Sequence, residues 1–477
     1  MFPCVNIVAA ISMMAICYRW QRCSRDPETN ETTRKSIMKT LFLLCALCSN
    51  LAVAEVQSDA KPDPAYTHRL SSSGPLSKEQ LLKQQAQKPA ARSMAATAAA
   101  STSTYTYLRC WYRTGSNPTK PTTTYVWGLD PSSGDYYRIN GYWWAGGLLN
   151  WENMFYSDVT QNTLQSVCQS TLSAKGISQP VAMVAAADNA LSFNYTVWTN
   201  DSVVQGGINK IVAFGDSLSD TQNVYNASQW KLPNSGSWFL GRFSNGKNWV
   251  EYLADNLQLP LYNWAIGGAG VSTQNLVIPG VIQQVQSYTE YMQKAQNYQP
   301  QNTLFTMLIG GNDLVNYNST VDQVISGQSQ ALQNLIQAGA RNILLLKLPD
   351  VSKAPVFTIK TNGPAVAAQV VDLNTRLAAL VASLQTQYGS SLHIRLFDSY
   401  ALFNDLLSNP AKYQVSNTTQ SCLNINTDSS TNYLSTQSAR SQCSNPDSFV
   451  FWDTLHPTTH THKLLADAVT AFYKAGQ

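Results

Sequence analysis

The chain has 477 residues, more than one typical domain, so two or three domains are expected. Hydrophobic residues make up 44% of it, enough for a sizeable core, whereas only 13% are charged, against a usual fraction of about 25%. A net charge of +4 excludes a polybasic nucleic-acid-binding protein, and it excludes a chain that is intrinsically disordered because of high net charge.

Residues 1–54 have the features of a secretory signal that begins at an internal methionine. Met38-Lys39 supplies a short positive region, Leu41 to Leu47 an apolar stretch, and Ala52-Val53-Ala54 a small-residue cleavage signal. We therefore expect translation to start at Met38, cleavage after Ala54, and secretion to the periplasm or the exterior. The apolar run Val5 to Cys17 is too short for a membrane span, which needs about 20 residues.

Removing residues 1–54 changes the charge and the cysteine count. The net charge falls from +4 to +1, and four of the nine cysteines remain. An even number of cysteines in an exported chain indicates disulfides, although four cysteines allow three pairings. Sequence proximity favours Cys110–Cys168 and Cys422–Cys443, with free buried thiols as the alternative.

The next two segments differ in composition. Residues 55–104 are rich in Ala, Ser, Gln, Lys and Pro, which predicts a flexible linker or pro-segment. Residues 105–207 are dense in Tyr and Trp between turn clusters, which predicts short strands and a small β-rich domain. Its aromatic side chains either pack the core or form a face that binds lipid or glycan, because Trp and Tyr suit an interface between apolar and wet surroundings.

Residues 208–477 alternate buried-strand and helix patterns, which predicts an α/β domain with a parallel sheet covered on both faces. Ligands bind such sheets at the carboxyl ends of the strands, where the chemical motifs of this sequence lie. The expected strands are 211–214, 304–309, 343–348 and 392–397, and the expected helices are 249–257, 281–298, 321–338, 365–388 and 462–473.

A candidate nucleophile follows the first of these strands. Ser217 comes directly after Gly215-Asp216, and a serine in such a turn can present its hydroxyl above the edge of the sheet. Backbone N–H groups at a following helix N-terminus favour negative charge there. We expect Ser219 and Asp220 to cap that helix.

A serine nucleophile needs a base, and only three of the five histidines cluster, namely His456, His460 and His462. Asp453 lies three residues before His456, so one turn can bring the carboxylate to the imidazole while His456 takes the Ser217 proton. The alternative for this pair is a helix-entry Asp with a surface His. His460 and His462 are expected on a helix surface. No ligand spacing indicates a metal site, and we expect no cofactor.

Two glycine-containing loops at strand ends offer donors for a developing oxyanion. In the segment 263–269, Gly267-Gly268 lets backbone N–H groups approach a substrate oxygen. In Gly310-Gly311-Asn312-Asp313, the Asn312 amide is a neutral donor suited to the same task.

Four segments in this order resemble the four sequence blocks of the GDSL-type SGNH hydrolases. They are 214–219, 263–268, 310–313 and 453–456, so the resemblance covers residues 208 to 475. It implies a flavodoxin-like three-layer α/β/α fold with Ser217 as nucleophile, His456 as base and Asp453 as its partner. It also implies an oxyanion hole made by Ser217, Gly268 and Asn312.

A closer resemblance, to the thermolabile (lecithin-dependent) haemolysin branch of that family, rests on residues 107–113, 198–201, 236–246 and 451–459. It implies a secreted phospholipase A or lysophospholipase that acts on membrane phospholipid, with cholesterol as a candidate acyl acceptor and no nucleic-acid partner. Two alternatives stay open. One is a GDSL carbohydrate or short-chain carboxylic esterase, and the other is a non-enzymatic, aromatic-rich surface adhesin.

The polar segment 423–442 lies between the last two cysteines. A Cys422–Cys443 bridge would constrain a loop of about 20 residues, worth roughly 3 kcal/mol in the chain-entropy model. The loop ends ten residues before Asp453. It is therefore a candidate lid over the acyl site or a target of an activating protease, with an ordinary surface insertion as the alternative.

Overall fold

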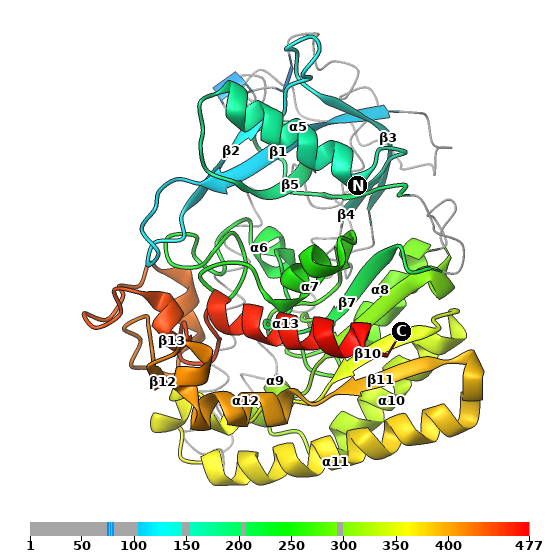
Figure 1. Cartoon of the computed structure of the whole chain (residues 1–477), viewed down its shortest axis with the longest axis vertical. Helices are drawn as coiled ribbons and strands as arrows, with labels where there is room; N and C mark the ends of the chain where they lie inside the picture. The colour runs from blue at the N-terminus through cyan, green and yellow to red at the C-terminus, as the bar shows by residue number, and fades with distance from the viewer. Residues whose placement is uncertain are drawn as a thin grey trace, which may run out of the picture. The chain divides into compact units, whose positions relative to one another are not determined.

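The computed structural model of the chain (Figure 1) describes residues 74, 75, 77, 79, 80, 104–145, 153–201, 207–292 and 299–476. The expected signal region, residues 1–54, lies outside the described residues, as does nearly all of the expected linker, residues 55–104. Two sheets form the main architecture, and both belong to one compact unit, Ser103–Gln477 with Lys61–Leu76.

The first sheet has the order β2-β1-β3-β4-β6, with β5 also paired to β1. Helix α5 (Gln161–Ala174), which the sequence analysis did not predict, packs on it and is tied to β1 by the Cys110–Cys168 disulfide. Tyr107, Trp111, Phe155 and Tyr156 are buried, so core packing accounts for these aromatic residues. The strands are β1 (Thr104–Arg113), β2 (Thr123–Trp127), β3 (Arg138–Ala145), β4 (Asn153–Tyr156), β5 (Val181–Ala187) and β6 (Thr196–Trp198).

The second sheet is parallel throughout and has the order β11-β10-β9-β7-β8. Counted along the chain this is 2-1-3-4-5, the flavodoxin-like order, as the family resemblance implies. The four predicted strands agree with the structure to within two residues, and only the three-residue strand β8 lacked a sequence signal. The strands are β7 (Lys210–Gly215), β8 (Leu261–Asn263), β9 (Thr303–Leu308), β10 (Asn342–Leu346) and β11 (His393–Phe397).

Helices cover both faces of this sheet and complete the three layers. Helices α7 (Trp249–Leu257) and α13 (Thr459–Lys474) pack together, whereas α10 (Val321–Gln337) packs against both α8 (Val281–Met292) and α11 (Gly363–Tyr388). Right-handed crossovers place α7 and α13 on one face of the sheet and α8, α10 and α11 on the other. In Figure 1, α11 runs along the lower edge of the drawing, and α13 lies in front of the strands.

Shorter elements connect these strands and helices. They are α6 (Asn223–Ala227), α9 (Gly311–Val315), α12 (Ser399–Ser408), β12 (Asn417–Ser421), β13 (Phe449–Phe451), η1 (Pro300–Asn302), η2 (Val351–Lys353), η3 (Pro355–Thr358), η4 (Gly389–Ser391), η5 (Pro410–Tyr413), η6 (Ser430–Leu434) and η7 (Pro446–Ser448). The longest helix, α11, is long and apolar enough to cross a membrane. Its buried residues recur every three or four positions, from Val366 to Leu384, because this stripe faces the core.

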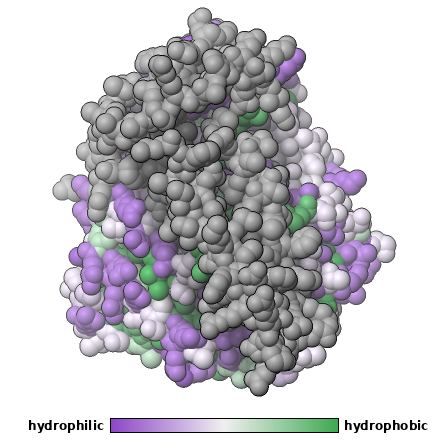
Figure 2. All heavy atoms as spheres, turned by 180° about the vertical axis from the view of Figure 1, so that it is seen from behind, coloured by the Kyte–Doolittle hydropathy of each residue, from purple (hydrophilic) through white to green (hydrophobic). Residues whose placement is uncertain are grey.

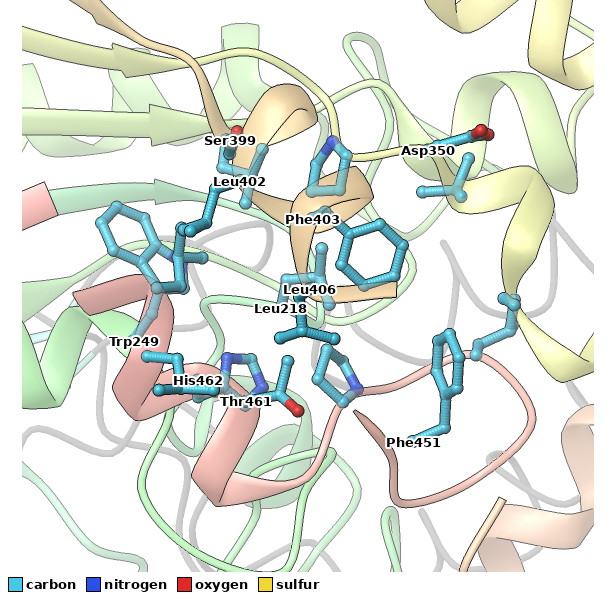
Figure 3. Close-up of a pocket in the computed structure, with 18 residues that line it drawn as sticks. Leu218, Trp249, Asp350, Ser399, Leu402, Phe403, Leu406, Phe451, Thr461 and His462 are labelled. Atoms are coloured by element: carbon cyan, nitrogen blue, oxygen red, sulfur yellow. The ribbon is translucent and has the colours of Figure 1, made fainter. Parts of the chain in front are cut away.

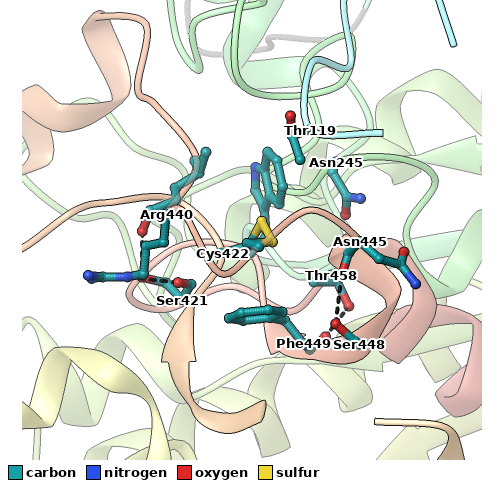
Figure 4. Close-up of a disulfide and its surroundings, with 12 residues drawn as sticks. Thr119, Asn245, Ser421, Cys422, Arg440, Asn445, Ser448, Phe449 and Thr458 are labelled. Atoms are coloured by element: carbon teal, nitrogen blue, oxygen red, sulfur yellow. Dashed lines mark hydrogen bonds between the residues drawn. A yellow bond between two sulfur atoms is a disulfide. The ribbon is translucent and has the colours of Figure 1, made fainter. Parts of the chain in front are cut away.

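The Cys422–Cys443 disulfide closes the loop that follows β12. It packs in a small apolar cluster with Trp238, Phe449 and Trp452. Figure 4 shows Arg440 beside it, where the Arg440 Nε donates to the carbonyl oxygen of Ser421 at 2.9 Å. Both disulfides are thus the ones that sequence proximity favours, and neither leaves a cysteine free among the described residues.

The two sheets share part of their core. Trp198 of β6 stacks on Tyr262 of β8 with ring centroids 4.1 Å apart, and the Thr199 N–H donates to the Tyr262 hydroxyl at 2.9 Å. On the face drawn in Figure 2, hydrophilic and near-neutral residues dominate the coloured surface, and hydrophobic residues form small, separate spots. The coloured part of this face therefore shows no single large apolar patch.

Candidate active site

Ser217 lies where the strand order of the parallel sheet reverses. It follows β7, whose neighbour β9 ends at Leu308, and the chain leaves these two strands toward opposite edges of the sheet. Such a switch point is the usual ligand site of open α/β sheets. Gly215 is required there, since a Cβ on this residue would lie 2.5 Å from the Leu308 carbonyl oxygen.

Three side chains form a continuous hydrogen-bonded relay at this point. His456 Nε2 lies 2.7 Å from the Ser217 hydroxyl oxygen, and His456 Nδ1 lies 2.9 Å from Oδ1 of Asp453. Asp453 and His456 are 0% and 5% exposed, whereas Ser217 is partly open to solvent. The structure therefore brings together the three residues that the sequence analysis names as nucleophile, base and acid, with the geometry of a Ser-His-Asp triad.

The Asp453 carboxylate is held by donors on every side. Oδ1 accepts hydrogen bonds from the N–H groups of Leu455 and His456, both at 2.9 Å, and Oδ2 accepts one from the Trp238 indole at 2.9 Å. Burial alone would raise the pKa of Asp453, but the charge of His456 and these donors outweigh it and lower the pKa. The carboxylate therefore stays ionised and can stabilise an imidazolium.

Tyr433, from the turn η6 inside the disulfide loop, also contacts the relay. Its hydroxyl lies 3.2 Å from His456 Nδ1 and 3.5 Å from Asp453 Oδ1, and its ring packs against Trp238 and Phe243. The segment 423–442 is therefore not an ordinary surface insertion, since one of its side chains belongs to the surroundings of the base. Burial, followed by the charge of Asp453, raises the pKa of Tyr433 well above its usual value, so the phenol stays neutral.

Several unpaired donors lie on the loops that carry the expected oxyanion residues. Within the described part of the chain, the N–H groups of Ser217 and Gly268 donate to no protein acceptor, although those of Gly267 and Ala269 do. The Asn312 amide nitrogen donates to the Ala269 carbonyl oxygen at 3.0 Å, which uses one of its two hydrogens. All three expected oxyanion residues are partly open to solvent.

The nucleophile loop and the glycine loop are fastened to each other by buried polar groups. The Asp220 carboxylate accepts from the Gly267 N–H at 2.8 Å and from the first N–H groups of α6, among them Asn223 at 2.7 Å. The expectation that Asp220 caps this helix is therefore confirmed. It is wrong for Ser219, whose hydroxyl instead accepts from the Trp249 indole at 3.0 Å. Burial raises the pKa of Asp220 to about 6.

An apolar cavity lies behind the triad loops, lined by Leu218, Leu455 and Pro457 and by residues of α12 and α13 (Figure 3). His462 lines it, is only 3% exposed and leaves its Nδ1 without a hydrogen-bond partner. The expectation of a surface position for His462 was wrong, because the first turn of α13 faces inward here. Burial, followed by the charge of His456, lowers the pKa of His462 to about 3. In the described residues no cluster of three His, Cys, Asp or Glu could hold a metal ion.

Trp238 and Tyr433 are the site residues that the sequence analysis missed. Trp238 lies 215 residues before the carboxylate to which it donates. No spacing rule connects two positions so far apart. A tryptophan between turn residues fits a role in core packing as well as a role in the site. Tyr433 stands in a run of Ser, Thr and Asn that looks like an exposed loop.

Comparison with known proteins adds two family matches. Residues 211–469 match the GDSL-like lipases and acylhydrolases, and residues 71–200 match the N-terminal domain of the Vibrio dual lipase/transferases. A thermolabile hemolysin of Vibrio parahaemolyticus is 44% identical over 369 residues, which are 76% of this chain and 87% of that protein.

More distant relatives differ in the names they carry. A phosphatidylcholine-sterol acyltransferase of Aeromonas hydrophila is 27% identical over 59% of this chain and 94% of its own length. An acetylesterase of Thermothelomyces thermophilus is 26% identical over 55% of this chain and 88% of its own length.

Proposed function

Because the chain belongs to the GDSL-like lipase/acylhydrolase family, we propose that it is a secreted serine esterase that hydrolyses acyl esters of glycerophospholipids and lysophospholipids. The observation that carries the proposal is the relay from Ser217 through His456 to Asp453, with contacts of 2.7 and 2.9 Å. Such a relay activates a serine hydroxyl for attack on an ester carbonyl.

In the first half of the reaction, the Ser217 oxygen attacks the carbonyl carbon of the acyl ester, and His456 Nε2 takes the hydroxyl proton. The negative charge on the tetrahedral intermediate is stabilised by the N–H groups of Ser217 and Gly268 and by the Asn312 amide. His456 then gives the proton to the departing glycerol oxygen, so lysophospholipid leaves and an acyl-enzyme remains.

In the second half, a hydroxyl group attacks the acyl-enzyme while His456 again acts as base. Water as the acceptor gives a free fatty acid. We propose cholesterol as a second acceptor, because its single hydroxyl offers the same chemistry and because a relative is a phosphatidylcholine-sterol acyltransferase. The same relative supports phosphatidylcholine as the acyl donor.

We also propose that residues 423–442 are the target of an activating protease. The residues 426–428 are exposed, and a cut there would leave both ends joined by the Cys422–Cys443 bridge. After such a cut, the segment that carries Tyr433 would be joined to the chain at its C-terminal end only. Tyr433 is the residue of this segment that contacts His456. Mapping a limited digest while recording ester hydrolysis tests this proposal, and a cut chain with unchanged turnover would contradict it.

Export through a signal peptide, with Met38 as the start and cleavage after Ala54, remains our proposal for the location of the enzyme. Two disulfides support it, because such bridges persist in oxidising compartments and are rare in the cytosol. Mass spectrometry of the protein collected from culture medium should give Glu55 as its first residue. An intact Met1 or Met38 in that fraction would contradict the proposal.

The test of function is the release of fatty acid from phosphatidylcholine and lysophosphatidylcholine vesicles, with and without cholesterol. Wild-type protein should release fatty acid and, with cholesterol, form cholesteryl ester. Ser217→Ala should abolish both while its melting temperature stays within a few degrees. Fatty-acid release that persists in the Ser217→Ala variant would overturn the assignment of Ser217 as the nucleophile.

A carbohydrate or short-chain carboxylic esterase is the second candidate, favoured by the acetylesterase relative. Acetylated xylan and p-nitrophenyl butyrate separate the two. A strong preference for long acyl chains supports the phospholipase, and a preference for acetate supports the second candidate. Membership of a lipase and acylhydrolase family argues against a non-enzymatic adhesin. An adhesin would release no acid from any of these esters.

A further inference from the structure

Four exposed aliphatic side chains lie on segments that contact the candidate active site, and they are unusual among the described residues. Only six large hydrophobic side chains of the described chain are exposed, and these four are Leu276, Val277, Ile359 and Leu434. We call them the apolar rim. The other two are Tyr136, which packs against Tyr107 of β1, and Val371, which lies on α11.

Each member of the apolar rim stands on a segment that contacts one part of the site. Leu276 and Val277 belong to the turn after the Gly268 loop, and Ile278 of that turn would lie 3.4 Å from a Cβ on Gly268. Leu434 follows Tyr433, whose hydroxyl lies 3.2 Å from His456 Nδ1.

Ile359 reaches the site by a third route. It follows η3, where the Val356 N–H donates to the Thr454 carbonyl oxygen at 2.9 Å, within the loop between Asp453 and His456. Its neighbour Lys360 donates to the Val315 carbonyl oxygen of α9 at 3.1 Å and pairs with Asp428 of the disulfide loop at 3.3 Å. Three separate segments that contact the site therefore each carry an exposed aliphatic side chain.

Leu276 has no structural reason to be leucine. It is 74% exposed, so it gains almost nothing from burial. Its φ of 67° and that of Asn275, 49°, are both positive, and the Val277 N–H closes the turn on the Gln274 carbonyl oxygen at 3.1 Å. A turn with positive φ at both central residues favours Asn-Gly, because a branched side chain is strained there.

We propose that the apolar rim is a docking surface for aggregated phospholipid. The rim side chains insert into the lipid surface, and a lipid ester can then reach Ser217. This inference rests on the proposed function and names the physical state of its substrate. Apolar side chains at the boundary of headgroups and acyl chains gain by leaving water. With a net charge of +1 after Ala54, the mature chain offers little general attraction to anionic lipid, so contact depends on these side chains.

The experiment measures vesicle binding and turnover separately. Leu276→Asn suits the positive φ, so the fold is retained, and it is combined with Val277→Asn or with Leu434→Gln. Val371→Asn is the matched control, because Val371 is 51% exposed on α11. Binding to phosphatidylcholine vesicles is measured by flotation in the Ser217→Ala background, and hydrolysis is measured on the same vesicles and on monomeric p-nitrophenyl butyrate.

The rim variants should lose at least about tenfold in vesicle binding and in vesicle hydrolysis, because each loses two aliphatic groups. Hydrolysis of p-nitrophenyl butyrate should stay within about twofold, and the control should match wild type in every assay. Unchanged binding by the rim variants, or an equal loss in Val371→Asn, would overturn the proposal. So would a wild-type dimer that the rim variants convert to monomer, since a second copy would then be the occupant.

Failure of the proposed function looks different. Wild-type protein that binds vesicles through the apolar rim but releases no fatty acid would contradict the phospholipase and leave the docking surface in place. Wild-type protein that cleaves p-nitrophenyl butyrate but binds no vesicle would overturn the docking surface and leave the esterase.

Discussion

The hydroxyl of Tyr433 lies 3.2 Å from Nδ1 of His456, the ring nitrogen opposite the one that contacts Ser217. Nδ1 also lies 2.9 Å from Asp453, so a phenol from the disulfide loop and a carboxylate share one side of the imidazole. The loop thereby takes part in orienting the base, although 23 residues separate Tyr433 from His456.

Tyr433→Phe should lower kcat by about fivefold and leave KM unchanged, because it removes a hydrogen bond worth about 1 kcal/mol and keeps the ring. Steady-state kinetics on p-nitrophenyl butyrate measure both constants. Tyr413→Phe is the control, since the hydroxyl of Tyr413 contacts Asp405, away from the triad. Equal kcat values for all three proteins would show that the phenol has only a packing role.

Trp238→Phe should lower the free energy of unfolding by about 1–3 kcal/mol at neutral pH, because it leaves a buried carboxylate oxygen with one donor fewer. The folded pKa of Asp453 is lowered from 3.8, so the stability it contributes is present above that pH and is lost as the pH falls through the folded pKa. The deficit of the variant should therefore shrink in strong acid.

Denaturant unfolding at neutral and acid pH measures that deficit. Trp230→Phe is a matched control, because its indole donates to Asn226 at 2.9 Å and not to the triad. A deficit of Trp238→Phe that stays constant with pH would contradict the assigned hydrogen bond to an ionised carboxylate.

Asn312→Ala should reduce kcat by about 100- to 1000-fold if its amide stabilises the oxyanion. Asn316→Ala should have a much smaller effect, below about tenfold, because the Asn316 amide nitrogen contacts the site through Asn312 Oδ1, to which it donates at 2.8 Å. The two are compared by burst and steady-state kinetics. The assignment is wrong if Asn312→Ala is no slower than Asn316→Ala.

His462→Phe should make the protein less sensitive to acid. Since burial lowers the folded pKa of His462 from 6.5 to about 3, the unfolded chain binds more protons between these values and stability falls as the pH falls through this window. A phenyl group cannot take up that proton. Melting temperatures recorded between pH 7 and pH 3 should fall less steeply in the variant, and parallel curves would contradict the prediction.

The two disulfides should differ in what their removal does. Replacing Cys422 and Cys443 by serine should cost about 3 kcal/mol of stability, and replacing Cys110 and Cys168 about 4 kcal/mol, because the closed loops have separations of 21 and 58 residues. Only the first pair should also lower kcat, because its loop carries Tyr433. Activity measured well below both melting temperatures separates these effects, and equal kcat losses would contradict the prediction.

Local patterns in the sequence carry much of this architecture. The apolar runs that became β7, β9 and β10 end close to Gly215, Gly310 and Pro349 respectively, and α7 begins with an Asn248–Glu251 capping box. Helix α5 was also readable, since Thr160 caps it and Leu164, Val167, Cys168, Thr171 and Leu172 recur at helical spacing. The dense aromatic residues around it favoured a purely β interpretation.

Contacts between distant segments could not be read in this way. The position of His462 depends on whether α12 and the sheet edge cover the first turn of α13, and an isolated helix pattern does not contain that information. The donor to Asp453 Oδ2 and the phenol beside His456 likewise depend on how loops dock. Local sequence patterns do not report such long-range packing.

The hydrogen bond between Ser217 and His456 spans 239 residues of chain and joins the first strand of the catalytic sheet to the loop before its last helix. During synthesis the nucleophile is made long before its base, and domains fold from the N-terminus as they emerge. A nascent or truncated chain therefore has a serine without a proton acceptor. A chain that stops before Asp453 lacks both the proposed base and its carboxylate, so the proposed esterase activity should appear only after residues 453–456 have been made.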